Sequence, residues 1–231
     1  MPLINGINAF HVHNPRCAGS AINNCLFDNK LLELKSLRPQ VLDAVNFYGI
    51  SNIDGQKLEL DHLSISQVIA RVSIDKIHST HFFSVVRHPW SRFKSDYFRK
   101  KERGDDRFLS AKNCTLEEYL ERFLLKASPK KNLFLKEQSQ SAHFWYQTWF
   151  ADFSHHPDII KCSVLKFENL HADWNAFQKK LGFSSPLLRK NINASHQSVK
   201  EIEDDSRLLR SELYQQFKQF YWCDYQRFEY N

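Results

Sequence analysis

The sequence repeats one local pattern, in which a β-prone run is followed by a short polar turn and then by a helical pattern. In the first copy, residues 7–13 alternate apolar and polar side chains, Pro15 breaks the run, and a helix is predicted from Gly19. In the second copy, residues 81–86 have the pattern of a buried strand, and Pro89 occupies the first turn of the next helix. Strands that alternate with helices favour a parallel sheet covered on both faces.

Other segments have the periodicity of regular structure, and they predict a strand over residues 163–167 and further helices. The predicted helices cover residues 64–72, a segment after a capping box of Thr115 and Glu118, residues 172–181 before Gly182, and residues 206–221. Leucine and valine residues between positions 30 and 60 suggest helical pieces broken at Pro39 and Gly49. A chain of 231 residues fits one domain over 1–231 better than two small ones.

The formal charge of +6 favours polyanionic partners, but charge alone does not choose among RNA, DNA, a nucleotide and a sulfated glycan. Five widely spaced cysteines without a CxxC pair argue against a disulfide framework and a zinc knuckle, and they fit a reducing compartment. No run approaches the roughly 18 apolar residues of a membrane span, and residues 1–10 lack the pattern of a signal peptide. We therefore expect no membrane span.

The turn after the first predicted strand is a candidate phosphate-binding loop. Ala18 and Gly19 are small enough for the backbone to approach an anion, and the helix N-terminus offers unpaired N–H groups. Arg16 and the Ser20 hydroxyl would complete the cradle. The segment lacks the first glycine and the lysine of the nucleotide-triphosphate motif GxxxxGK[ST], and a plain strand-to-helix turn is an equally good interpretation.

The turn after the second predicted strand is another phosphate candidate. Arg87 lies at the carboxyl end of the strand, where ligands collect in open α/β sheets. Arg92 and Ser95 are three residues apart and share a helix face, and a guanidinium with a hydroxyl suits a phosphate. Arg92 could instead pair with a carboxylate in the core.

Together the two segments resemble the PAPS-dependent sulfotransferases (PAPS is 3′-phosphoadenosine 5′-phosphosulfate), specifically the carbohydrate group with the 2-O-sulfotransferases and their bacterial relatives. Pro15 to Ala21 is similar to the family's P-K-x-x-G-T-S loop, and the family's R-x-P-x-x-R-x-x-S-x-Y motif is matched from Arg87 to Tyr97. The resemblance implies that the loop holds the 5′-phosphosulfate through Arg16, Cys17, Ala18, Gly19, Ser20 and Ala21. It implies that Arg87 and Ser95 hold the 3′-phosphate.

Weaker similarities extend over nearly the whole chain. Residues 143–148 are similar to the family's H-F-x-P-Q-T, 166–170 to R-Y-E-N-L, and 224–228 to D-F-x-x-F. Asn193 and Ser195 match an N-x-S that lies near the nucleotide in the family. The implied fold is a P-loop-like three-layer α/β fold, with a central, mainly parallel sheet flanked by helices.

The implied reaction moves a sulfuryl group from PAPS to a hydroxyl of an acceptor, with a carbohydrate as the expected acceptor and PAP (3′-phosphoadenosine 5′-phosphate) as product. The SO₃ group carries less charge than a phosphoryl group, so no metal is expected. No nucleic-acid partner is expected either. The family usually has Lys where Arg16 stands, and Arg16 could stabilise the leaving phosphate but not supply a proton to it.

An acceptor hydroxyl needs a base, and His62 is the predicted one because Asp61-His62 is similar to the G-H-like motif with the family's catalytic histidine. The alternative is that His62 caps a helix or lies on the surface. His81, His13 and Glu59 are the next candidates.

Several alternatives stay open at this stage. The chain could be a small-molecule kinase with a degenerate phosphate loop, or a non-catalytic RNA-binding module. The pairs His11 with His13 and His155 with His156 superficially suggest metal ligands, but no complete ligand set accompanies them. Trp145, Tyr146 and Trp149 could stack a sugar or adenine, and Cys17 could be oxidisable. A cytoplasmic enzyme of bacterial type is expected, with an excised Golgi-lumen catalytic domain as the alternative.

Overall fold

The computed structural model describes residues 3–4, 6–31, 50–53, 56–59, 62–70, 72–104, 109–127, 142–187 and 205–231. The chain divides into two compact units, which are described separately below. Unit 1 comprises residues 1–87 and 147–192, and unit 2 comprises residues 88–146 and 193–231. A single domain over 1–231 stays a prediction.

Unit 1 contains a four-stranded sheet in the order β1-β2-β5-β6. β2, β5 and β6 are parallel, whereas β1 pairs with β2 in the antiparallel sense. The strands are β1 (Leu3–Ile4), β2 (Ala9–His11), β5 (His81–Val86) and β6 (Lys161–Lys166). The predicted α/β fold with a mainly parallel sheet is therefore confirmed.

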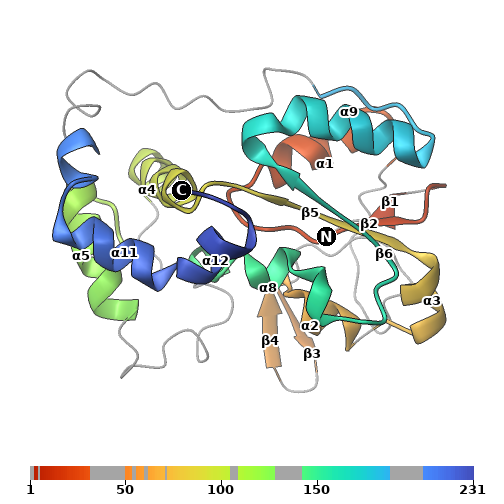
Figure 1. Ribbon diagram of the computed structural model, residues 1–231, viewed down its shortest axis with the longest axis horizontal. Helices are drawn as coiled ribbons and strands as arrows, with labels where there is room; N and C mark the ends of the chain where they lie inside the picture. The colour runs from red at the N-terminus through yellow and green to blue at the C-terminus, as the bar shows by residue number, and fades with distance from the viewer. Residues whose placement is uncertain are drawn as a thin grey trace. The chain divides into compact units, whose positions relative to one another are not determined.

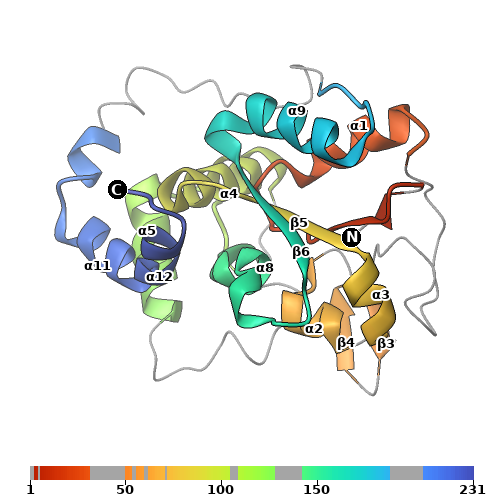
Figure 2. The same ribbon diagram turned by 45° about the vertical axis from the view of Figure 1, so that its right-hand side comes forward.

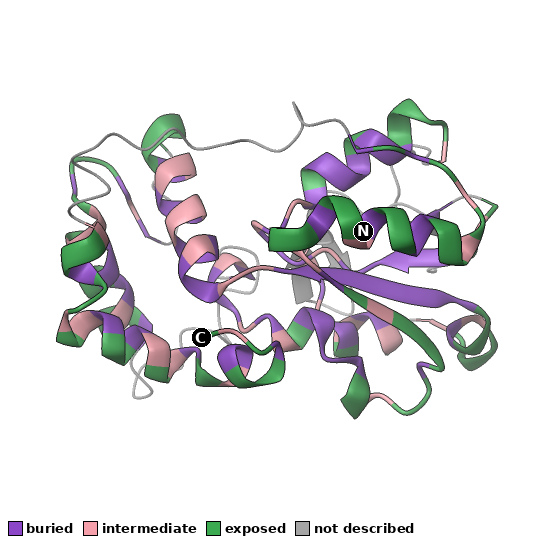
Figure 3. Ribbon diagram, turned by 45° about the horizontal axis from the view of Figure 1, so that its top comes forward, coloured by how far each residue is buried: buried purple, intermediate pink, exposed green. Residues whose placement is uncertain are grey.

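Helices cover both faces of this sheet (Figures 1 and 2). α1 (Gly19–Asp28) and α9 (Leu170–Leu181) lie on one face, and α8 (Thr148–Ala151) lies on the other. The apolar residues of α1 and α9 pack against Phe83 and Val85 of β5 in one buried cluster. Every residue of β5 is buried, whereas most of the edge strand β6 is not (Figure 3). The run at 81–86 thus forms the predicted buried strand.

Unit 1 also holds elements that the sequence pattern did not indicate. β3 (Ile50–Ile53) and β4 (Gln56–Glu59) form an antiparallel pair where helical pieces were predicted, and the rest of that prediction, residues 32–49, lies outside the described residues. The predicted helix at 64–72 is the shorter α2 (Ile65–Ile69), and it is followed by α3 (Ile74–Ser79). Short 3₁₀ segments cover Phe153–His155 and Phe167–Asn169.

Unit 2 is helical and is held together by aromatic side chains. Its elements are α4 (Pro89–Arg103), α5 (Leu116–Ala127), the 3₁₀ segment Ala142–Phe144, α11 (Glu212–Phe220) and α12 (Trp222–Arg227). Rings from α4, α5 and α11 meet in one core, where Phe93 lies 5.3 Å from Phe123 and 5.2 Å from Phe217 between ring centroids. Thr115 and Glu118 form the predicted capping box ahead of α5.

The single helix predicted over 206–221 is wrong. α11 begins only at Glu212, because the Ser211 hydroxyl accepts a hydrogen bond from the Tyr214 N–H and caps a new helix. In the part of the chain that the structure describes, no helix is both long and apolar enough to cross a bilayer.

Candidate functional site

The loop after β2 has a backbone that suits an anion. Arg16 and Ala18 adopt positive φ angles of 65° and 66°, a left-handed conformation that costs a non-glycine residue roughly 1–2 kcal/mol. Such turns direct successive N–H groups to one side, which is how backbone nests bind phosphate. α1 then begins at Gly19, and Ala18 at its N-cap has no side-chain oxygen to cap it. Residue 18 therefore leaves the N-terminus of α1 without a side-chain cap.

Gly19 is required at this position by the packing of His13. A Cβ atom built on Gly19 would lie 1.9 Å from Nε2 of His13, so the imidazole occupies the space that any other side chain would need. The ring of His62 lies next to His13, with 4.8 Å between their centroids. The ring of His13 therefore contacts both Gly19, the first residue of α1, and His62, the predicted base.

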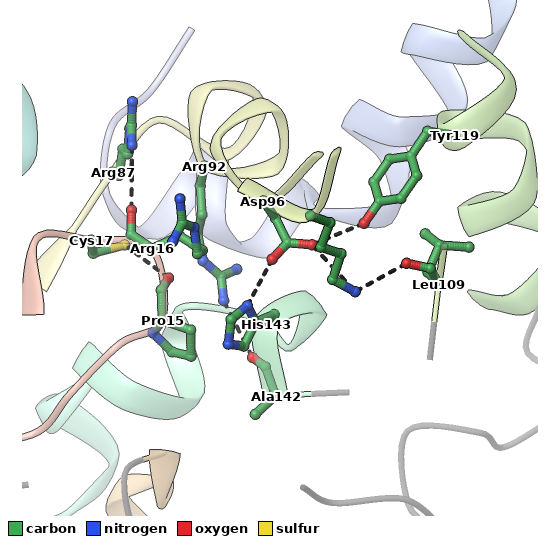
Figure 4. A network of polar contacts seen from close by, with 11 residues as sticks. Pro15, Arg16, Cys17, Arg87, Arg92, Asp96, Leu109, Tyr119, Ala142 and His143 are labelled. Carbon is green, nitrogen blue, oxygen red and sulfur yellow. Dashed lines mark hydrogen bonds and ion pairs between the residues drawn. The ribbon is translucent and has the colours of Figure 1, made fainter. Parts of the chain in front are cut away.

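Arg87 reaches the same loop from the end of β5. Its Nη1 atom donates a hydrogen bond of 3.4 Å to the carbonyl of Arg16 (Figure 4), and its guanidinium lies 4.1 Å above the ring of Phe167. Stacking and hydrogen bonding together fix a planar cation at the carboxyl end of the parallel strands. Two residues that were singled out from separate motifs are therefore in contact.

Buried polar side chains connect the chain after β2 to β5 at this end of the sheet. The paired residues of β2 and β5 end at His11 and Phe83, and a further backbone bond runs from Val12 N to Phe83 O. Beyond it, Ser84 Oγ donates to the carbonyl of Val12 at 2.8 Å, and Asn14 Nδ2 donates to the carbonyl of Val85 at 3.0 Å. These side-chain bonds hold the loop to β5.

Gln147 and Asn14 are residues of this region that sequence reasoning left without a role. Gln147 stood only within the segment similar to H-F-x-P-Q-T, and Asn14 only as the first residue of the candidate loop, with no contact assigned to either side chain. Both side chains are almost completely inaccessible, with 0% and 1% exposure. A buried amide must have hydrogen-bond partners, so their burial, which the sequence does not show, is the signal that marks them.

The other predicted nucleotide residues have different locations. Ser95 lies half-buried on α4 in unit 2. Asn193 and Ser195 lie outside the described residues. Arg92 is buried and donates to the carbonyls of Trp145 at 2.8 Å and Ala142 at 3.4 Å. Its guanidinium therefore connects α4 to the segment before residue 146, through carbonyls rather than through a core carboxylate.

Of the alternative bases, His13 packs on Gly19 at the start of α1, whereas His81 lies far from the loop. His81 begins β5, at the opposite end of the strand from Arg87, and six residues of strand span roughly 16 Å. Its Nε2 lies 2.9 Å from the Ser163 hydroxyl, and burial and the nearby Lys180 lower its pKa. The Glu59 side chain lies outside the described part of the structure.

A second polar cluster lies within unit 2 around Asp96 (Figure 4). Its buried carboxylate accepts hydrogen bonds from Tyr119 Oη at 2.9 Å and His143 Nδ1 at 2.7 Å, and Lys100 Nζ lies 3.7 Å away. Burial, and after it the charge of Asp96, raise the pKa of Tyr119. These groups connect α4, α5 and the 3₁₀ segment at 142–144, so we assign the cluster a structural role.

The remaining sequence candidates can be located as well. Trp145 is buried and Tyr146 packs on Phe220 and Tyr221 in unit 2, whereas Trp149 is partly exposed on α8. His155 contacts Asp152 at 3.3 Å, but among the described residues no three potential metal ligands gather. All five cysteines are free thiols, and Cys17 is buried in the loop.

Comparison with known proteins gives one result. A model of the family described as "Sulfotransferase family" matches residues 50–231, which is more than half of the chain and includes Arg87 and Ser95 but not the loop at 14–21. No curated protein and no solved structure matches the chain.

Proposed function

The chain belongs to the sulfotransferase family, and on that premise we propose that it binds PAPS at the carboxyl end of its parallel sheet and transfers the sulfuryl group to a carbohydrate hydroxyl. Membership makes the protein a sulfotransferase, so the kinase and the non-catalytic RNA-binding module are set aside. The observation that carries the proposal is the contact between Arg87 and the loop carbonyl of Arg16. This contact brings the guanidinium of Arg87 to the backbone of the loop that carries Arg16, which supports one shared site.

The residues fit a nucleotide with phosphates at both ends. The left-handed turn at Arg16 and Ala18 and the N-terminus of α1 would receive the 5′-phosphosulfate through backbone N–H groups. Arg87 would hold the 3′-phosphate. The donor supplies an activated sulfuryl group, and the protein's part is to align the acceptor and stabilise charge on the leaving phosphate. Arg16 would do the latter as a permanently charged fork.

His62 is the proposed general base. The acceptor oxygen forms a bond to sulfur while the bond from sulfur to the phosphate oxygen breaks, and the hydroxyl proton passes to the neutral imidazole of His62. PAP then leaves with the bonding electrons as a phosphate anion. Support comes from the ring contact of His62 with His13, which itself packs on Gly19 at the start of α1. A base beside the phosphosulfate loop is well placed to meet an acceptor oxygen.

Calorimetry with PAP in EDTA tests the nucleotide site. We expect binding without metal, and Arg87→Ala should raise the Kd for PAP roughly 10- to 100-fold, the equivalent of one lost charge-assisted contact. Adenosine 5′-phosphosulfate lacks the 3′-phosphate, so its Kd should change much less. Arg207→Ala, in an exposed pair with Glu117, is the matched control. No PAP binding by folded protein would overturn the proposal.

The acceptor is tested separately, with sulfur-labelled PAPS and a panel of glycans. Label transferred to a glycan hydroxyl supports a carbohydrate acceptor. Transfer only to phenols, steroids or peptide tyrosine would replace that acceptor while leaving the nucleotide site in place.

A further inference from the structure

The side chain of Gln147 connects the two segments that carry the proposed nucleotide site. It lies at the N-cap of α8, the helix on the opposite face of the sheet from α1 and α9, and it is fully buried. Its Oε1 accepts hydrogen bonds from Arg87 N at 2.9 Å, from Asn14 Nδ2 at 3.1 Å and from Cys17 Sγ at 3.4 Å. Its Nε2 donates to the carbonyl of Arg87 at 2.7 Å.

The side-chain amide of Gln147 is thus hydrogen-bonded to both the backbone N–H and the backbone carbonyl of Arg87. The pairing of β5 with β6 ends at Val86, so Arg87 is the first residue beyond the ladder. There the Gln147 amide replaces a neighbouring strand, because it donates to the carbonyl and accepts from the N–H of the same residue. A backbone N–H can only donate and a carbonyl can only accept, so the orientation of the amide is determined. The backbone at Arg87, and with it the direction of its side chain, is fixed.

The same oxygen fixes the loop. Asn14, whose amide also donates to Val85 O, and Cys17 lie on either side of Pro15 and Arg16, and both donate to Gln147. The guanidinium of Arg87 also contacts the loop, through the 3.4 Å bond to Arg16 O. Because the bonds from Gln147 are to the backbone of Arg87, they can persist when a ligand draws the guanidinium away.

We propose that Gln147 is a positioning residue for the nucleotide, which couples the loop at 14–18 to Arg87 so that both phosphate contacts are made in one fixed geometry. This inference rests on the proposed nucleotide site. Pre-organisation of this kind lowers the free-energy cost of ordering the site on binding. It follows that the contribution of Arg87 to binding depends on Gln147, although Gln147 itself need not touch the ligand.

A double-mutant cycle with Arg87→Ala and Gln147→Met tests the coupling. Methionine has a similar length and volume but cannot form the four hydrogen bonds. In the wild-type background, Arg87→Ala should raise the Kd for PAP roughly 10- to 100-fold. In the Gln147→Met background the same change should raise it less than about threefold, because Arg87 is already misplaced. If the two substitutions acted independently, their fold-changes in the Kd for PAP would multiply in the double variant. That outcome would overturn the inference.

Gln178→Met is the matched control. Gln178 is another buried glutamine of unit 1. It lies on α9, and its Oε1 accepts a hydrogen bond from Ser185 N in the segment that follows the helix. Its loss should lower the melting temperature by an amount comparable to that of Gln147→Met. The full effect of Arg87→Ala on PAP binding should nevertheless persist in the Gln178→Met background. A loss of that effect in both backgrounds would assign Gln147 only a stability role.

The outcomes also separate this inference from the proposed function. If the wild type does not bind PAP, the nucleotide site itself is wrong, and the coupling falls with it. If the wild type binds PAP and Arg87→Ala weakens it equally in both backgrounds, only the role of Gln147 is wrong. Gln147→Asn, which keeps the amide but shortens its reach, provides the cycle if Gln147→Met does not fold. Failure of both variants to fold would make Gln147 a determinant of folding and overturn its assignment as a positioning residue.

Discussion

The carboxyl end of the sheet in unit 1 and the core of unit 2 are both well packed, but different interactions hold them. At the end of the sheet, three buried polar side chains, those of Ser84, Asn14 and Gln147, form directed bonds to backbone groups and to one another. In unit 2, rings from separate helices fill the core, and five other rings lie within 6.3 Å of the Phe93 ring between centroids.

The difference teaches which property each region preserves. Aromatic packing is worth several kcal/mol but tolerates small shifts, because burial of apolar surface has no direction. Hydrogen bonds add less net stability, yet they fix distances to a few tenths of an ångström. Substitutions in unit 2 should therefore act mainly on stability, and substitutions at the end of the sheet mainly on ligand binding and turnover.

The largest expected effect is on turnover. His62→Ala should lower kcat about 10²- to 10⁴-fold on a genuine acceptor while the Kd for PAP stays nearly unchanged, because a base contributes to proton removal and not to nucleotide binding. The wild-type rate should rise with pH, since only the neutral imidazole accepts a proton, and the variant should lose that rise. His78→Ala on the exposed surface of α3 is the control. Normal turnover by the His62 variant would direct attention to His13, His81 and Glu59.

The next effect is on stability and belongs to unit 2. Phe217 is fully buried among the rings of α4 and α5, so Phe217→Ala should lower the free energy of unfolding by about 3–5 kcal/mol. Leu125→Ala, at a side chain that is 70% exposed on α5, should change it by less than about 0.5 kcal/mol. Urea denaturation measures both values. Similar losses for the two variants would show that the aromatic core does not dominate this unit.

A smaller loss of stability is expected in acid, and it originates in unit 1. His11 is fully buried on β2, and this burial lowers its pKa from 6.5 to about 3. Between those values the unfolded chain binds a proton at this position and the folded chain does not, so stability falls as the pH falls below about 6.5. From pH 8 to pH 5 the loss should be about 2 kcal/mol. The stability of a His11→Gln variant should fall less steeply over that range, and parallel curves would contradict this origin.

The smallest effects should be equal in the two units, because helix caps are local. Ser64 accepts a hydrogen bond from Gln67 N ahead of α2 in unit 1, and Ser211 accepts one from Tyr214 N ahead of α11 in unit 2. Ser64→Ala and Ser211→Ala should each lower the free energy of unfolding by about 1 kcal/mol. A loss at one site several times that at the other would show that one cap also sets tertiary packing.

Much of the fold could be predicted because local patterns determined it. The strand at 81–86 has the predicted bounds, and the proline at the start of α4, the capping box before α5 and the glycine after α9 lie where the sequence placed them. The pair of β3 and β4 was missed because the helical prediction for this region relied on leucine and valine residues that precede both strands. The break before α11 was missed because Ser211 was taken as part of a continuous helix instead of a cap.

The candidate site was less predictable. The motifs indicated the loop at 16–21 and Arg87, since small residues and cations after strands have a direct chemical meaning. They did not indicate that Gln147 bridges the two, because that contact joins positions 60 or more residues apart in the chain. Only the tertiary structure shows which amide is buried and what it contacts.

The parallel pairing of β5 with β6 has a consequence for synthesis. The register joins residue 81 to residue 161, a separation of 80 residues, with the first part of unit 2 inserted between the two strands. At 5–20 residues per second, a ribosome would complete β6 on the order of 4 to 16 s after β5. For that interval the fully buried strand 81–86 lacks the partner on its β6 side. We expect this segment to bind chaperones while the chain is being made and to nucleate aggregation when the protein is refolded from denaturant.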